Sequence, residues 1–168
     1  MKKILTISGE YTAKEIEVLQ DLITDFRARI SDDDPEKNIL NKKSFQFSDD
    51  KIVQFYRSAI RDINGGSPKT NYSIFSFYAR EDAGLLVTGA IIFSLIAEGL
   101  LQLRNQMDFS DSGLNIALFN KSGAYQGWAG FMLQQYIEDK REFKRGIVPR
   151  SPNSGFIGIS SEFDYGEW

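Results

Sequence analysis

The most constraining feature of this sequence is one apolar stretch, residues 83–103, which reads AGLLVTGAIIFSLIAEGLLQL. Its uncharged part covers about 15 residues, whereas a helix that crosses a bilayer needs about 20 apolar residues. Glu98 and Arg104 come too early for such a span. An apolar stretch of this length in a globular protein is typical of a buried helix. We therefore expect a central core helix here. Four small residues favour close approach by its neighbours: Gly84, Ala90, Ala97 and Gly99.

Two amphipathic helices precede this stretch. Thr12 and Glu15 have the spacing of a capping box, which predicts a helix over residues 13–30. Ser48, followed by two acidic residues, predicts the start of a second helix. The second helix carries an apolar stripe at Ile52, Phe55, Ala59, Ile60 and Ile63. It should end at residues 64–66, Asn-Gly-Gly, because these residue types tolerate left-handed geometry. Residues 71–78 favour a short strand or an extended segment.

The second half of the chain mixes several patterns. Residues 108–113 are typical of a turn, and residues 114–119 of a short strand. A final helix is expected over 124–144, where Gly127 and Gly130 suggest close packing against another backbone. Residues 146–168 contain prolines, glycines and six large apolar residues, Phe156, Ile157, Ile159, Phe163, Tyr165 and Trp168. This pattern predicts an extended tail that docks either on its own core or on a neighbouring subunit.

The fold class that follows is mainly α. We expect a helical bundle around a buried hydrophobic helix, with a small β-hairpin or strand insertion and an extended C-terminal tail. The length of 168 residues fits one domain. That domain is expected over residues 1–145, with the tail over 146–168. The first ten residues begin like a secretory signal, but their apolar part is too short, which argues against a signal peptide.

The composition excludes much of enzyme chemistry. The chain has no Cys and no His, which removes thiolate nucleophiles, the commonest metal ligands and the commonest general base. The run Asp32-Asp33-Asp34 does not fit a calcium loop, because Lys37 stands at the glycine position and Lys43 at the position of the bidentate acid. A solvated loop is expected there. No catalytic residue, cofactor or metal site is predicted.

One carboxylate is a candidate for other chemistry. Glu98 lies inside the apolar helix, and a pocket near Glu98, Tyr125 and Trp128 would suit a small-molecule-binding protein or an enzyme that works without His. The more ordinary interpretation is a Glu98 that pairs with an arginine or faces solvent.

Nucleic-acid binding is not predicted. The net charge is -3, and nucleic-acid binding usually needs a basic face. The densest basic cluster, Lys140, Arg141, Lys144 and Arg145, suits a helix C-terminus as well as it suits a phosphate contact.

Two stretches taken together resemble a known family. Residues 47–64 read FSDDKIVQFYRSAIRDIN and precede PKTNY at 68–72, and residues 108–116 read DFSDSGLNI and precede a helix that ends in Lys and Arg. This order is similar to the head–tail connector or adaptor (neck) proteins of tailed bacteriophages. The resemblance implies a small, mainly helical structural protein without a cofactor. It also implies a ring of copies between portal and tail, in the virion and in the host cytoplasm during assembly.

The leading hypothesis is therefore a structural virion protein and not an enzyme. Its expected partners are copies of itself, the portal and tail proteins, and no membrane, with DNA contact left open. The small-molecule pocket near Glu98 is the second hypothesis, and a membrane-active role for residues 83–103 is the third.

Overall fold

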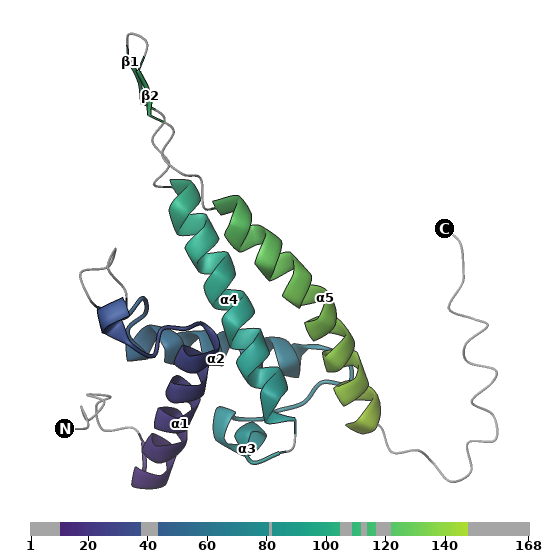
Figure 1. The fold of residues 1–168 in the computed structure, drawn as a ribbon. Helices are drawn as coiled ribbons and strands as arrows, with labels where there is room; N and C mark the ends of the chain where they lie inside the picture. The colour runs from purple at the N-terminus through teal and green to yellow at the C-terminus, as the bar shows by residue number, and fades with distance from the viewer. Residues whose placement is uncertain are drawn as a thin grey trace, which may run out of the picture.

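The computed structural model describes residues 11–37, 44–80, 82–104, 109–111, 114–116 and 122–147. The protein is mainly α-helical, and its helices pack around α4 (Figure 1). The elements in chain order are α1 (Ala13–Arg29), a 3-10 turn (Pro35–Lys37), α2 (Asp49–Gly65), α3 (Ile74–Tyr78), α4 (Ala83–Arg104), β1 (Phe109–Asp111), β2 (Leu114–Ile116) and α5 (Ser122–Ile147). The predicted central helix at 83–103 is confirmed, because α4 contacts α1, α2, α3 and α5.

Helix α1 begins as the sequence predicts. The Thr12 backbone N–H donates to the Glu15 carboxylate at 2.8 Å, and the Glu15 N–H donates to the Thr12 hydroxyl at 3.4 Å, which is the predicted capping box. These hydrogen bonds hold the pKa of Glu15 below its usual value. The apolar stripe of α1 includes Leu19 and Phe26, both fully buried. The helix ends where Ser31 adopts a left-handed conformation with φ 58°.

Helix α2 also matches its prediction, although its end has a different cause. Ser48 caps its first turn, and all five residues of the predicted stripe are buried. Gly66 is extended rather than left-handed, with φ -71°. The side chain of Asn64 instead holds the following loop, donating to the Tyr72 carbonyl at 2.8 Å and accepting from the Tyr72 N–H at 3.0 Å. The Asn64 amide therefore replaces a left-handed cap.

The predicted strand at 71–78 does not form, and the alternative, an extended segment leading into a helix, is limited to the residues before Ile74. Residues Ile74–Tyr78 form the short helix α3, which Ser73 caps by accepting the N–H of Ser76 at 3.0 Å. Burial favours this helix, because one turn places Phe77 in the core against Phe143, with ring centroids 5.1 Å apart. Tertiary packing thus overrides a local preference for extended structure.

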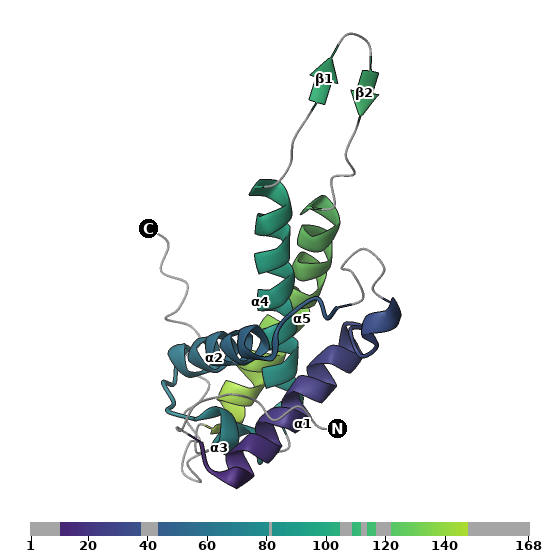
Figure 2. The ribbon, with the colours of Figure 1, turned by 90° about the vertical axis from the view of Figure 1, so that its left-hand side faces the viewer.

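Helices α4 and α5 lie side by side and antiparallel, and together they extend beyond the part of the molecule that α1, α2 and α3 form (Figures 1 and 2). They approach closely at Gly89, where a Cβ atom would lie 3.0 Å from the Tyr136 ring and 3.1 Å from the Ala59 side chain. A small residue of α4 therefore does allow close approach, but this residue, Gly89, was not among the predicted ones. The prediction fails at Gly84, Gly127 and Gly130, where a Cβ would meet nothing within 4 Å.

The chain between α4 and α5 contains two short strands. They pair antiparallel, with Phe109 opposite Ile116 and Asp111 opposite Leu114. Strand β1 lies within the residues predicted as a turn, and β2 begins at the predicted residue. Helix α5 extends to Ile147, so its last two residues belong to a helix and not to the predicted tail.

Candidate assembly surface

Part of α4 does not reach the core. Leu86 and Ala90 are completely buried, but nearer the C-terminus of the helix Leu100 is 56% exposed and Leu103 is 51% exposed. Ile96, Leu100 and Leu103 are spaced i, i+4 and i+7, which places them on one side of the helix. We call these three residues the α4 ridge. The C-terminal end of α4 extends beyond α1, α2 and α3 (Figure 2).

Helix α5 shows a similar change along its length. Tyr136 contacts α4 at Gly89 and is buried, and Ala129, two turns earlier, is buried as well. Two larger residues lie off this face, with Trp128 65% exposed and Phe131 76% exposed. These two residues, together with Ala124 and Gly127, line a shallow hollow of about 450 Å³. We call these four residues the α5 patch.

These surfaces have the composition of a protein interface. Single exposed apolar residues are ordinary, but grouped ones mark interaction sites. Tryptophan in particular is enriched among the residues that dominate interface energetics. Burying a Phe or Leu side chain completely stabilises by about 1.5–3 kcal/mol. The α4 ridge and the α5 patch therefore offer enough apolar surface to drive association.

The predicted pocket near Glu98 exists only in part. Glu98 is 4% exposed, and its carboxylate accepts a hydrogen bond from the Gln102 amide at 2.8 Å. Glu98 and Tyr125 line one cavity of about 340 Å³. Burial, followed by the charge of Glu98, raises the pKa of Tyr125. Trp128 is not among the lining residues, because it belongs to the α5 patch.

Neither ordinary interpretation of Glu98 matches its surroundings. The side chain is buried and so does not face solvent, and within the described part of the chain no Lys or Arg lies within 4.0 Å of its carboxylate. Its hydrogen-bond partner is a neutral amide. The cavity thus presents a carboxylate that has no ion-pair partner among the described residues. Such a carboxylate is suited to binding a cation, and it is not by itself evidence of catalysis.

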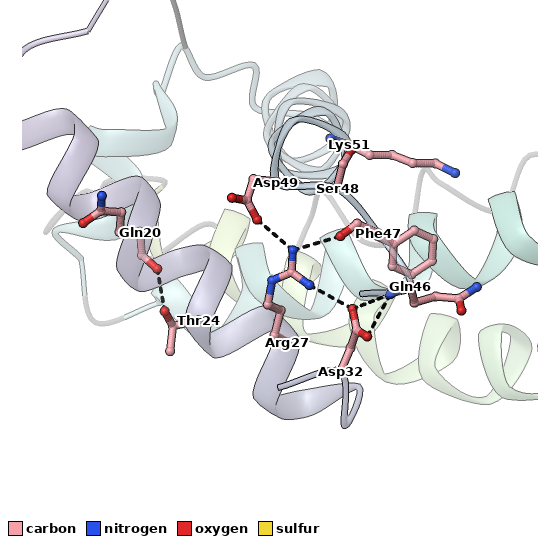
Figure 3. A network of polar contacts seen from close by, with 9 residues as sticks. All are labelled: Gln20, Thr24, Arg27, Asp32, Gln46, Phe47, Ser48, Asp49 and Lys51. Carbon is pink, nitrogen blue, oxygen red and sulfur yellow. Dashed lines mark hydrogen bonds and ion pairs between the residues drawn. The ribbon is translucent and has the colours of Figure 1, made fainter. Parts of the chain in front are cut away.

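Asp32 is not part of a solvated loop, contrary to the sequence prediction. It is buried, and its carboxylate pairs with the Arg27 guanidinium at 2.9 Å and accepts the Gln46 N–H at 2.8 Å (Figure 3). Arg27 also donates to the Phe47 carbonyl at 2.9 Å and to Asp49 at 2.7 Å. Arg27 thus neutralises Asp32 and ties the end of α1 to the start of α2. Among the residues that the structure describes, no group of three acidic side chains is placed to hold a metal ion.

The predicted interface residues of the tail, Phe156, Ile157, Ile159, Phe163, Tyr165 and Trp168, lie outside the described residues. Helix α4 is long and apolar enough to cross a membrane by length and composition alone. However, 56% of its most apolar window is buried in the fold, and the core helix of a soluble protein passes the same test.

Sequence reasoning did not find the α4 ridge or the α5 patch. The available signal was the breadth of the apolar stretch itself, because a helix that is apolar on every side needs partners on every side. No family model, curated protein or solved structure matches this chain.

Proposed function

We propose that this chain is a structural protein that works by assembling with copies of itself and with neighbouring proteins. The observation that carries the proposal is the exposure of Trp128 and Phe131 on α5, and of the α4 ridge on the helix that packs against α5. A helical pair that extends from the body with its largest apolar residues in solvent is suited to docking against another chain.

The more specific form of the proposal is a neck component of a tailed bacteriophage. Its support is the resemblance of residues 47–72 and 108–116 to head–tail connector proteins, together with the mainly α-helical fold. In this form the copies make a ring between portal and tail. The α4 ridge and the α5 patch are two different surfaces, and contacts between unlike surfaces generate closed rings when the rotation between copies closes.

Self-assembly is tested by measuring molar mass in solution. We expect the purified chain to be oligomeric by size-exclusion chromatography with light scattering. The double substitution Trp128→Ser and Phe131→Ser should weaken association at least 10-fold, because each buried aromatic contributes about 1.5–3 kcal/mol. The matched control is Gln126→Ser with Gln134→Ser, which changes two exposed polar residues of the same helix and should leave the molar mass unchanged.

The outcomes distinguish self-assembly from the more specific role in a phage neck. A wild-type chain that stays monomeric at all concentrations, and a double variant identical to it, would contradict the assembly role. An oligomeric chain that mass spectrometry does not detect in purified particles would contradict the neck role and leave self-assembly intact.

A second candidate function rests on the buried carboxylate of Glu98. Its cavity would suit a small cationic ligand, because the carboxylate has no basic partner among the described residues. With spermidine as the probe, the melting temperature should rise with amine concentration by mass action. Glu98→Gln should remove that rise, whereas Glu17→Gln, at an exposed site on α1, should not. An equal rise in all three proteins would reject the site.

A further inference from the structure

At the far end of α5 from the α5 patch, a hollow of about 460 Å³ is lined largely by cations. Helix α5 contributes four basic residues from its last two turns, and the loop after α2 contributes the opposite wall. The lining residues are Lys140, Arg141, Lys144, Arg145, Gly66, Ser67 and Pro68. The whole chain carries a net charge of -3, so this concentration of positive charge is local.

Most of this positive charge is not neutralised by the fold. Lys140 pairs with Asp62 at 2.7 Å, and it is the one lining cation that forms an ion pair within the described ranges. The Asp62 carboxylate oxygen that binds Lys140 also accepts the Tyr136 hydroxyl at 2.8 Å. Arg141 and Arg145 are exposed at the rim and form no ion pair with a described residue. Among the described residues, Asp62 is therefore the one carboxylate that pairs with any of these four basic residues.

Lys144 is held rigidly in this wall. Its side chain is buried, and its ammonium donates to the Pro68 carbonyl at 2.7 Å and to the Thr70 hydroxyl at 2.9 Å. Burial, and secondly the charge of Lys140, lowers the pKa of Lys144. Both of these acceptors are neutral oxygens, and no described carboxylate forms an ion pair with Lys144. An anion in the hollow would supply a countercharge.

Cations near a helix C-terminus also offset the helix dipole, and α5 ends two residues after Arg145. Offsetting the dipole does not require the basic residues to line a hollow or to lie beside the loop after α2. Two guanidinium groups at the rim match the oxygens of a phosphate group, to which arginine donates two parallel hydrogen bonds. The site is open and the arginines are one helical turn apart, which suits a phosphate attached to a longer chain.

We propose that this hollow binds a phosphate group, and that the group comes from the backbone of duplex DNA. Arg141 and Arg145 bind the phosphate oxygens from the rim, and Lys140 and Lys144 set the positive potential behind them. Contacts of this kind carry no base specificity. The proposal does not depend on the assembly role, because it concerns the opposite end of α5.

The test is binding of a fluorescent 20-base-pair duplex by the full chain, followed by anisotropy at about 50 mM salt. Arg141→Gln with Arg145→Gln should weaken binding at least 10-fold. It should also reduce the slope of log K against log salt by about 0.9, the contribution of the one phosphate that the hollow binds. The matched control, Lys14→Gln with Lys51→Gln, removes the same charge from exposed positions on α1 and α2 and should change affinity less than 2-fold.

Inorganic phosphate distinguishes the two sources of the group. If the duplex binds and millimolar phosphate competes in the wild type, the DNA backbone is the ligand. If phosphate alone raises the melting temperature, and only when Arg141 and Arg145 are present, the site takes free phosphate. Equal duplex binding by the arginine variant and the lysine control, or no effect of either ligand on the wild type, would overturn the proposal. Since both arginines are exposed and form no ion pair with any residue that the structure describes, circular dichroism should show both variants folded.

Discussion

Helices α4 and α5 are buried in one region of the molecule and exposed in another. We call the region where α1, α2 and α3 pack the body, and the part of α4 and α5 beyond it the extending end. In the body, Leu86 and Ala90 of α4 are completely buried, and Gly89 lets Tyr136 of α5 approach. At the extending end, Leu100 of α4 and Phe131 of α5 are mostly in solvent. Both regions of α4 are rich in large aliphatic residues, so hydrophobicity alone does not distinguish them.

The difference lies in the partners that the chain supplies. Helices α1, α2 and α3 pack along the body and end there, so among the described helices the remaining length of α4 and α5 has no further partner (Figure 2). Apolar composition indicates that a surface will be covered, but not which molecule covers it. The comparison predicts that the body carries the folding stability and the extending end carries association.

The largest expected loss of stability comes from removing Arg27. Arg27→Ala leaves Asp32 buried without its cation, and breaking such a pair typically costs about 3–5 kcal/mol. Urea unfolding followed by circular dichroism measures this loss. Arg29→Ala is the control, because Arg29 pairs with Asp25 at 3.2 Å on the surface and such pairs contribute about 0–1 kcal/mol. Equal losses in the two variants would show that the Arg27 network does not stabilise the body.

The second largest loss of stability is expected from a substitution at Gly89. In Gly89→Val the new Cβ meets Tyr136 at 3.0 Å and Ala59 at 3.1 Å, so α4 must move away from both neighbours. Overpacking of this kind costs about 1–3 kcal/mol, measured by denaturant unfolding. Gly130→Ala meets nothing within 4 Å, and it should stabilise the protein by up to about 1 kcal/mol through helix propensity. A destabilised Gly130→Ala would mean that the surface of α5 is covered in the isolated chain.

Local signals in the sequence were sufficient for the helices of the body. Thr12 and Ser48 determine where α1 and α2 begin through hydrogen bonds within three residues, and the apolar stripes determine which faces are buried. The central position of α4 followed from its composition. Features that depend on distant partners were not predictable in this way. Packing of Phe77 against Phe143 favours a helix where the local pattern favoured extended chain. This helix was not predictable from the local pattern, because Phe143 is far along the sequence.

The candidate surfaces show the same limit. Asp32 seemed solvated because nothing near it in sequence indicated that Arg27 and the Gln46 backbone would enclose it. Glu98 and Tyr125 were expected in one pocket and do line one cavity, because α4 and α5 pack side by side. Trp128 was assigned to the same pocket, but it lines a separate hollow.

A smaller effect is expected within the body, at Tyr136. Its hydroxyl donates to Asp62 at 2.8 Å, and Tyr136→Phe should cost about 1 kcal/mol near neutral pH. Burial, and then the hydrogen bond to Asp62, raises the pKa of Tyr136. The folded state therefore retains the phenol proton that the unfolded state loses above about pH 10.

This proton contributes stability that is fully present below pH 10 and is lost as the pH rises further. Unfolding measured between pH 8 and 11 should thus show a decline with pH that is shallower in Tyr136→Phe, by at most about 1.4 kcal/mol per pH unit. Tyr56→Phe is a comparison within the body, since burial raises the pKa of Tyr56 as well. An unchanged alkaline slope in both variants would contradict the assignment of these protons to the folded state.

The smallest effect on folding is expected at the extending end. Leu100→Ser with Leu103→Ser removes two leucines that are already about half exposed, so the free energy of unfolding of the monomer should change by no more than about 0.5 kcal/mol. If the α4 ridge docks against another chain as proposed, the dissociation constant of the assembly measured by sedimentation should rise at least 10-fold. A loss of several kcal/mol in the monomer would instead place the α4 ridge against its own chain. In that case the body and the extending end would be one folding unit, and the apolar composition of α4 would be fully explained by folding.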